Sequence, residues 1–415
     1  MSTVSNTTNV AVAAAMILVA CTDPPGQPPV TVTTRDSAGI VIVENRIDTL
    51  GIRAGWVLSG TPTLTIGGVD VPDSQQVFRV GGARRLPDGR IAVVDGGDAE
   101  LRIYGARGQL EHTIGGKGEG PGEFESPQLA GLLGSDSVIV HDSQLRRVSI
   151  LHVDAGYARS YPIGEEGGGY PVAIGITADG GLAMGGGMFF SSEAGFPTGA
   201  VRPNSRYVVL TPNGSVRGDF GDVPAAEMFA RSSGGMFQAS TLPFGRVTAA
   251  AAAADRIWLG TGDAWEIRAY TLDAVLMRIV RFDRARLPVT AELREAYVDE
   301  RIANARNEAV ARDIRVQMAE VPIPEWVPPY NHVVVDALQH LWIGEYLLPG
   351  QLSRTYTIVN ADGWAVGRLT MPPRTRPLDI GPDYVLGVTL DELDVEQLTL
   401  WSLERPSIHS RGSGM

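Results

Sequence analysis

Short runs of alternating hydrophobic and polar residues recur along the chain, in pairs joined by a turn that carries Asp or Gly. The first pair reads LPDGRIAVVD at 86–95, and the next reads GSDSVIVHD at 134–142. Similar pairs surround six turn residues, which are Asp88, Asp136, Asp179, Asp255, Gln339 and Asp383. A period of two predicts strands, and such turns join antiparallel neighbours. We therefore expect six strand–turn–strand units.

A second strand pair follows the first in most units, again around its own turn. Examples are LRIY at 101–104 before ARG, and YVVL at 207–210 before PNG. Two hairpins in a row make a four-stranded meander, the blade of a β-propeller. The turn residues are 48, 43, 76, 84 and 44 residues apart, so two connections carry insertions. The pattern predicts an all-β, six-bladed β-propeller over residues 39–405.

The last unit is expected to lack its outer strand, because only a polar tail follows QLTLWSL at 397–403. An unpartnered segment near the N-terminus, TLTIGG at 63–68, shares Thr-Ile-Gly-Gly with the outer strand of the first unit. We expect the residues near position 65 to pair with the strand around Leu400 and close the ring, which removes an exposed sheet edge. A separate small N-terminal β-domain is the alternative.

Two stretches depart from strand alternation. Residues 185–203 are rich in glycine and aromatic side chains and are expected to form a long loop inside the third blade. Residues 290–320, between blades four and five, have the apolar spacing of a helix, with Thr290 as its N-cap and a proline-rich stop after it. This helical insertion must lie on one mouth of the ring, either as a lid or as a packing decoration.

The chain begins with an apolar run at 10–20 that is too short to span a membrane. The run ends in Leu18, Val19, Ala20 and the only cysteine, Cys21. This ending resembles the lipobox of bacterial lipoproteins, which implies cleavage before Cys21 and attachment of a diacylglyceryl group. Residues 1–20 are then a signal peptide, and 21–38 a flexible lipid-anchored tether. A chance apolar start is the alternative, since 1–9 contain no Lys or Arg.

Some strand ends resemble NHL repeats, in which an acidic residue is followed by a polar turn and arginine. The closest copies are DSQLRRV at 142–148 and DGGDAELRI at 95–103. Together with the lipobox and the run IGGKGEGPGEF at 114–124, they make the chain similar to bacterial six-bladed β-propeller lipoproteins related to NHL proteins. The resemblance covers roughly residues 61–403. The resemblance implies a six-bladed β-propeller and an exported location, but it does not imply a catalysed reaction.

Charge and motifs narrow the function classes. The chain has 35 basic and 47 acidic residues, a net charge of −12, which argues against nucleic-acid binding. Its six histidines form no HxH or HxxxH pair and Cys21 has no second cysteine, so no metal and no cofactor are expected. No Gly-x-Ser-x-Gly nucleophile signature is present, and we name no catalytic residue. The glycine run at 115–122 lacks the following helix of a phosphate loop and is expected to connect two blades.

Acidic residues near the ends of the middle strands are the candidates for a ligand-binding face or channel, namely Asp95, Asp142, Asp263 and Glu345. Asp95 with Arg102, and Asp142 with Arg146 or Arg147, are expected to fasten inter-strand turns, with ligand contact as the alternative. Aromatic residues at strand ends are a second candidate surface, although two of them, at equivalent strand positions, are expected in the core; the four are Trp258, Trp265, Trp342 and Tyr346.

These observations favour a non-catalytic binding scaffold, anchored by its lipid to the periplasmic or cell-surface face of a bacterial membrane. Its partner is an unknown envelope protein or a small ligand, contacted through loops at the mouth of the ring. The alternative is a cation-dependent hydrolase or lactonase, which needs carboxylates from several blades around one ion in the channel. A structural role without a ligand is a third reading. Residues 406–415 are expected to form a disordered tail.

Overall fold

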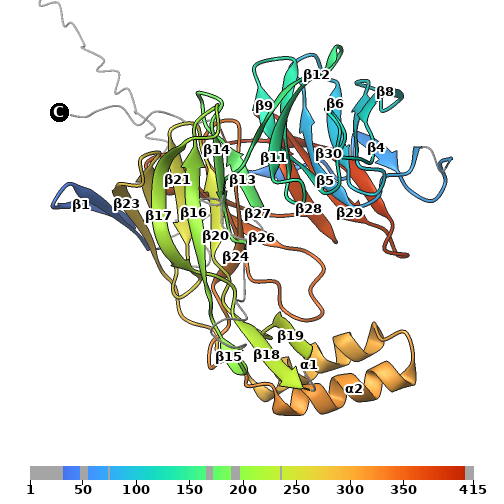
Figure 1. The fold of residues 1–415 in the computed structure, drawn as a ribbon. Coiled ribbons are helices and arrows are strands. Elements are labelled where there is room, and N and C mark those ends of the chain that lie inside the picture. Colours follow the sequence, from blue (N-terminus) through green and yellow to red (C-terminus); the bar gives the residue numbers. More distant parts are fainter. Residues whose placement is uncertain are drawn as a thin grey trace, which may run out of the picture.

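The computed structural model describes residues 31–46, 55–72, 75–164, 172–187, 197–233 and 236–406. Over these ranges the protein is all-β, built mainly from antiparallel sheets, with two helices in the chain connection that leads from the fourth sheet to the fifth (Figure 1). The predicted signal peptide, the lipobox with Cys21 and nearly all of the predicted tail lie outside the described residues. Neither described helix is long and apolar enough to cross a membrane.

Sheets 1 and 2 are four-stranded meanders in which each strand pairs with the next one along the chain. Sheet 1 consists of β5 (Val80–Arg85), β6 (Ile91–Asp95), β7 (Glu100–Tyr104) and β8 (Leu110–Gly115). Sheet 2 consists of β9 (Pro127–Leu133), β10 (Ser137–Asp142), β11 (Arg147–His152) and β12 (Gly156–Pro162). The glycine run at 115–122 connects the two sheets, as predicted.

Sheets 3 and 4 follow the same plan with additions. Sheet 3 consists of β13 (Val172–Ile176), β14 (Leu182–Gly185), β16 (Asn204–Leu210) and β17 (Val216–Pro224). Sheet 4 consists of β20 (Ala249–Ala252), β21 (Arg256–Gly260), β22 (Glu266–Thr271) and β23 (Leu276–Asp283). Two N-terminal strands, β1 (Thr31–Ser37) and β2 (Ile40–Arg46), extend sheet 4 beyond β23.

Sheets 5 and 6 complete the series. Sheet 5 consists of β24 (Tyr330–Val335), β25 (Leu341–Glu345), β26 (Thr355–Val359) and β27 (Ala365–Thr370). Sheet 6 combines β28 (Thr375–Ile380), β29 (Tyr384–Leu390) and β30 (Glu396–Glu404) with β3 (Val57–Leu58) and β4 (Leu64–Gly67). All six turn residues of the sequence repeat lie between the first and second strands of a sheet, as predicted.

The first strands of these sheets contact one another in a closed cycle, from β5 to β9, β13, β20, β24, β28 and back to β5. Small residues allow the close approach, because a Cβ added at Gly81 in β5 would lie only 2.6 Å from the carbonyl oxygen of Pro127 in β9. The core lies between neighbouring sheets, where apolar residues of one sheet pack against those of the next. The fold is therefore propeller-like.

The two ends of the described chain meet in sheet 6. Strand β4 pairs with β30 in antiparallel register, with Leu64 opposite Leu400 and Thr65 opposite Thr399. Ile66 of β4 is buried in the same cluster as Val80. The prediction that this segment pairs with the last strand is confirmed, and the alternative of a separate N-terminal domain is wrong for it.

The N-terminal boundary differs from the prediction. Strand β1 begins at Thr31, inside the stretch 21–38 that the sequence predicted as a tether. Its β-branched residues pair with β2, which in turn runs parallel to β23 at the outer edge of sheet 4. The buried Asn45 side chain then bridges to sheet 5, donating to the carbonyl of Gly363 at 3.0 Å and accepting from the amide of Ala365 at 2.8 Å.

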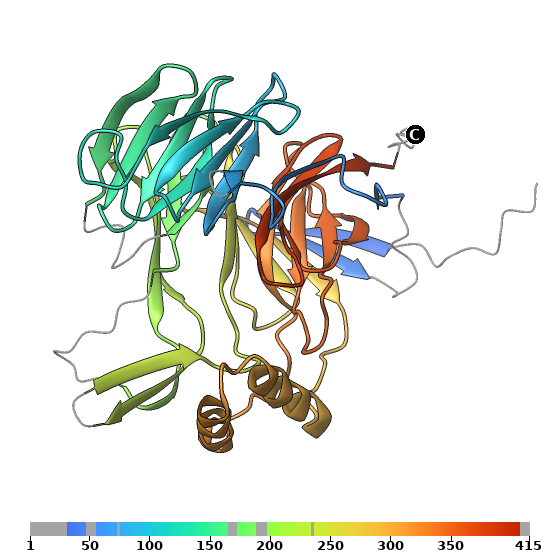
Figure 2. The same cartoon turned by 90° about the vertical axis from the view of Figure 1, so that its right-hand side faces the viewer.

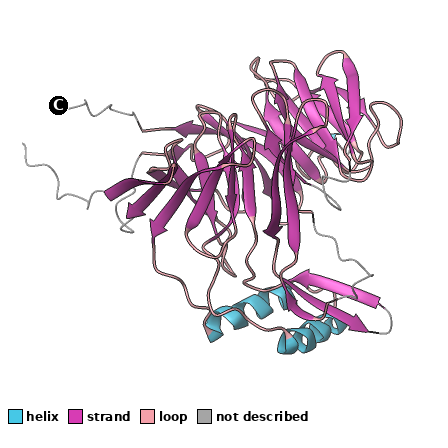
Figure 3. Ribbon diagram, turned by 60° about the vertical axis from the view of Figure 1, so that its left-hand side comes forward, coloured by secondary structure: helices cyan, strands magenta, loops and turns pink. Residues whose placement is uncertain are grey.

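A small subdomain, here called the cap, lies on one side of the sheets (Figures 2 and 3). It consists of β15 (Gly199–Val201), β18 (Met228–Ser233), β19 (Met236–Thr241), α1 (Ala291–Ala303) and α2 (Glu308–Glu320). These elements come from three connections, β14 to β16, β17 to β20 and β23 to β24. The strands form one three-stranded sheet, and Leu242 next to it packs against Met318 and Tyr297 of the helices.

The cap corrects two expectations. The stretch 185–203, predicted as one long loop, contains strand β15, which pairs with β18. The single helix predicted at 290–320 is two helices. Thr290 caps α1 as predicted, accepting from the amide of Leu293 at 3.3 Å. Asn304 ends α1, and Asn307 caps α2 with a 3.0 Å hydrogen bond from the amide of Val310, because asparagine favours such positions.

Candidate ligand-binding cavity

A cavity of about 1060 Å³ lies where the cap meets sheets 4 and 5. Its walls come from the β21–β22 turn, the chain leaving β23, the segment 322–329 after α2 and the loop after β25. The apolar part of the wall is mainly aromatic and proline-rich, and includes Trp265, Phe282, Leu287, Trp326 and Tyr346. This volume is large enough for a small organic ligand.

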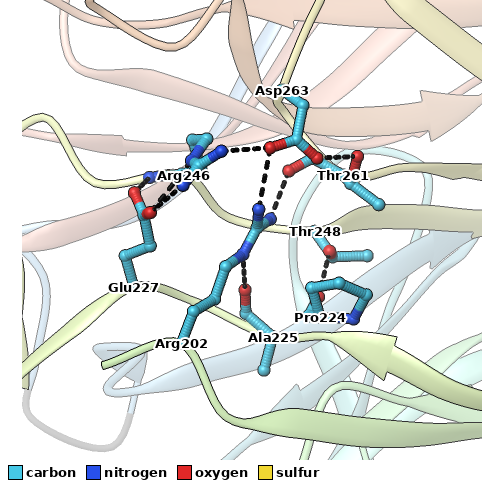
Figure 4. Close-up of polar contacts among 8 residues, drawn as sticks. All are labelled: Arg202, Pro224, Ala225, Glu227, Arg246, Thr248, Thr261 and Asp263. Carbon is cyan, nitrogen blue, oxygen red and sulfur yellow. Dashed lines mark hydrogen bonds and ion pairs between the residues drawn. The ribbon is translucent and has the colours of Figure 1, made fainter. Parts of the chain in front are cut away.

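One polar cluster of the wall is centred on Asp263 (Figure 4). Arg202, which leaves β15, donates to Asp263 at 3.0 Å, and Arg246 donates to the same carboxylate oxygen. Arg246 also donates through Nε to Glu227 at 2.9 Å. Two arginines thus face two carboxylates, so their charges compensate one another. The cluster ties two of the cap connections, β14 to β16 and β17 to β20, to the β21–β22 turn of sheet 4.

The carboxylates of this cluster are held in the charged form. Burial acts to raise the pKa of Glu227, but the hydrogen bonds from Arg246 outweigh it and hold that pKa below its usual range. Burial also acts to raise the pKa of Asp263, and the hydrogen bond from Thr261 with the charges of Arg202 and Arg246 outweighs it, so that pKa is lowered too. Neither group is therefore suited to donate a proton near neutral pH.

A second cluster is centred on Glu345, the last residue of β25. Arg284 from the chain after β23 donates to Glu345 Oε1 at 3.0 Å, and Arg368 of β27 donates to the same oxygen at 2.6 Å. Arg284 also donates to the hydroxyl of Thr357 at 3.1 Å, and its guanidinium lies 4.4 Å from the ring centroid of Trp265. Two arginines share one carboxylate, so this cluster carries a net positive charge.

The arginines of this second cluster are only partly satisfied. The Nε atoms of Arg284 and Arg368 are buried and have no hydrogen-bond partner in the described part of the chain. Burial lowers the pKa of Arg284, an effect that the charge of Glu345 opposes. A guanidinium stays charged in a protein even so. The cluster therefore presents a desolvated cation at the cavity wall.

The structure separates the four acidic candidates into two pairs. Asp263 and Glu345 both line the cavity, whereas Asp95 and Asp142 hold turns in sheets 1 and 2. Asp95 accepts from the amides of Phe78 and Gly97 and forms the predicted ion pair with Arg102 at 3.1 Å.

Asp142 is bound by backbone amides within the described part of the chain. It accepts from four N–H groups at 2.8–3.0 Å, those of Glu125, Ser126, Gln144 and Leu145. Asp142 was expected to pair with Arg146 or Arg147. Arg147 instead donates to backbone carbonyls of the glycine-rich connection, at 2.8 Å to Glu119 and 2.7 Å to Gly120, and Arg146 donates to the carbonyl of Gly164 at 2.6 Å. The side chains of Asp142 and Arg147, at the two ends of the β10–β11 turn, are therefore held by different backbone groups and not by each other.

The aromatic candidates also separate. Trp258 and Trp342 are fully buried core residues, as predicted, and Trp265 and Tyr346 line the cavity. Sequence reasoning missed Arg284 and Arg368, which bring the charge to Glu345. Arg284 lies in a connection that follows no repeat, so no sequence signal places it beside sheet 5.

The described residues contain no group of three or more His, Cys, Asp or Glu side chains that could hold a metal ion. The convergence of carboxylates that the hydrolase or lactonase alternative requires is therefore not found among them. The cavity wall combines arginine and carboxylate side chains with aromatic side chains. Arginine and aromatic groups of this kind bind anions and rings.

No family model matches the chain, and no curated protein matches it. Among solved structures, a protein described as exported from Bacteroides fragilis is 13% identical, with 88% of this chain and 99% of that chain covered and a TM-score of 0.48. A duf4221 family member from Bacteroides vulgatus is 10% identical, with coverages of 84% and 99% and a TM-score of 0.45.

The PQQ-bound aldose sugar dehydrogenase from Streptomyces coelicolor is 11% identical, with coverages of 85% and 100% and a TM-score of 0.43. At such identities and TM-scores, these similarities do not extend to a site or an activity of this chain. The similarity to NHL-related lipoproteins stays a prediction from the sequence.

Proposed function

We propose that this protein is an exported, lipid-anchored, six-bladed β-propeller that binds a small ligand in the cavity beneath the cap and does not transform it. The observation that carries this proposal is the cavity itself, whose wall combines aromatic side chains with an arginine pair, Arg284 and Arg368, whose Nε atoms are buried and have no hydrogen-bond partner in the described chain. Sites of this kind, apolar with a few convergent polar groups, are typical of ligand binding.

Six blades are supported by the six successive sheets and by the closed cycle of their first strands. Joining β4 to β30 leaves sheet 6 with an outer strand from the opposite end of the chain, a closure that β-propellers use. A rigid ring of this type holds long connections such as the cap without disturbing its core.

Export and anchoring rest on the N-terminal sequence alone. Leu18-Val19-Ala20-Cys21 follows an apolar run, and a lipid on Cys21 would hold the protein on the periplasmic or cell-surface face of the membrane. Labelling cells with a palmitate analogue tests this step: we expect label on the native protein and none on Cys21→Ala. Equal labelling of both proteins would contradict the anchor.

Calorimetric titration of the purified full-length protein tests the cavity. We expect a naphthalene probe, as 2-naphthoate or neutral 2-naphthamide, to bind the native protein with one site. The variant Ala264→Trp places a large side chain on the cavity wall and should abolish binding, whereas Ala155→Trp, on an exposed turn of sheet 2, should not. Failure of both probes to bind, or equal binding by Ala264→Trp, would overturn the site.

A further inference from the structure

We propose that the ligand is an organic carboxylate with a ring or apolar body, and that its carboxylate is held by Arg368 together with Arg284. This inference rests on the proposed binding function and names the chemical class that the same cavity takes. Its starting point is the excess of one positive charge where two arginines share the single carboxylate of Glu345.

Arg368 has donors to spare. Its side chain is 30% exposed at the cavity wall, and its hydrogen bond in the described chain runs from Nη2 to Glu345, so Nη1 is without a partner there. A guanidinium presents five N–H donors in a planar fork that matches the two oxygens of a carboxylate. A ligand carboxylate on this fork would balance the charge that Glu345 leaves uncompensated.

Arg284 is the fixed member of the pair. Its side chain is only 12% exposed, held by Glu345, Thr357 and the face of Trp265. Such locking orients the guanidinium before a ligand arrives, which reduces the entropy lost on binding. The pair thus combines one rigid and one adaptable cation, with an aromatic ring beside them for the body of the ligand.

The charge of the whole cavity wall favours a ligand with one negative charge over a ligand with two. Six acidic residues and five arginines line the cavity, so beyond the Glu345 cluster the wall does not attract anions. A phosphate dianion would leave a negative charge uncompensated in a partly desolvated site. A carboxylate matches the excess charge without this penalty.

The apolar wall defines the rest of the ligand. Trp326 and Leu287 line the cavity and remain 37% and 45% exposed. Prolines at 322, 324, 328 and 329 add further apolar surface around them. Exposed apolar side chains in a concave site gain free energy when a ring or hydrocarbon covers them.

Titration with three probes that share one ring system tests the inference. We expect 2-naphthoate to bind about tenfold or more tightly than 2-naphthamide, because charge-assisted hydrogen bonds are the stronger kind. We expect 2-naphthyl phosphate to bind less tightly than 2-naphthoate. Equal affinity of naphthoate and naphthamide, or tighter binding of the phosphate, would overturn the assignment of the class while leaving the binding function intact.

Two substitutions at the pair should shift affinity in opposite directions. Arg368→Gln removes the adaptable cation and should abolish the preference for naphthoate over naphthamide. Glu345→Gln removes the internal competitor and should tighten naphthoate binding several-fold, about threefold or more. A merely structural role for the cluster would weaken binding in both variants, so changes of the same sign would contradict the proposal.

Two further variants keep the test interpretable. Arg368→Lys retains the charge without the fork and should bind naphthoate between the native protein and Arg368→Gln. Arg315→Gln removes an arginine of α2 that pairs with Glu308 at 3.1 Å outside the cavity wall, and it should leave all three affinities unchanged. If neither naphthoate nor naphthamide binds the native protein, the proposed function itself fails rather than the ligand class.

Discussion

Sheets 1, 2 and 5 carry an acidic residue at one equivalent place, the last residue of the second strand. Asp95 lies opposite Val80, Asp142 opposite Pro127 and Glu345 opposite Tyr330, each the first residue of its sheet's first strand. In sheets 1 and 2 the carboxylate is 1% exposed and bound by turn amides, with Arg102 added in sheet 1. In sheet 5 its side chain is 25% exposed and shared by two arginines at the cavity.

The partner position shows why the roles differ. Arg102 lies on β7 opposite Val93, and Thr357 occupies the corresponding place in β26 opposite Ile343. The guanidinium of Arg102 donates hydrogen bonds to Glu100, Asp98 and the Gln76 carbonyl and forms an ion pair with Asp95. In sheet 5 the threonine leaves room for Arg284, which arrives from the long connection that holds the helices. The acidic residue at the end of the second strand thus has a structural role in sheet 1, where the neighbouring connection is short. In sheet 5, where a long connection lies beside it, the same position is available for a ligand.

The largest effect is expected from Asp142→Ala. This change leaves four partly buried N–H groups without their acceptor and should lower the free energy of unfolding by about 4 kcal/mol. Urea unfolding followed by tryptophan fluorescence measures it. A loss below about 1 kcal/mol would mean that Asp142 does not fasten the turn.

His141 precedes Asp142 in sheet 2, whereas Gly344 precedes Glu345 at the equivalent position in sheet 5. We expect His141 to make the free energy of unfolding depend on pH. Burial lowers the pKa of His141 to about 4, below the roughly 6.5 of an unfolded histidine. The unfolded chain therefore takes up the proton first, and stability is lost as pH falls from about 6.5 to 4, by about 3 kcal/mol for this group. Urea unfolding at pH 7.5 and 4.5 should show a smaller loss in His141→Leu than in the native protein. Equal losses would contradict the assignment.

A smaller effect on stability is expected from Glu345→Gln. The side chain is partly solvated and the amide keeps one acceptor for Arg284, so the free energy of unfolding should fall by about 1 kcal/mol. The same urea titration measures it beside Asp142→Ala. If Glu345→Gln destabilised the protein as much as Asp142→Ala, the carboxylate of sheet 5 would be as structural as that of sheet 2.

The repeat itself could be predicted from the sequence because its hairpins are local. Alternation and turn residues fix each meander. The lack of an outer strand in the last unit pointed to a pairing of the residues near position 65 with the strand around Leu400, and the structure pairs Thr65 with Thr399. The cap could not be predicted in the same way. Strand β15 pairs with β18 although β16 and β17 of sheet 3 lie between them in the sequence, and no sequence period relates the two segments.

The sequence predicted acidic and aromatic residues of the candidate site but not their arginine partners. Glu345 and Asp263 were identified because they lie at or near the ends of strands of the repeat, and Trp265 because it is an aromatic residue near such an end. Their arginine partners were not, since Arg284 reaches sheet 5 from the connection after sheet 4 and Arg202 reaches Asp263 from the β15–β16 connection. Side chains that meet only through tertiary packing leave no spacing in the sequence.

The most direct measurement is a crystal structure of the protein with 6-bromo-2-naphthoate, located by the anomalous scattering of bromine. We expect the bromine among the apolar side chains beneath the cap and the carboxylate oxygens about 2.7–3.2 Å from nitrogens of Arg368. Bromine outside this cavity, or a carboxylate pointing away from both Arg368 and Arg284, would contradict the account.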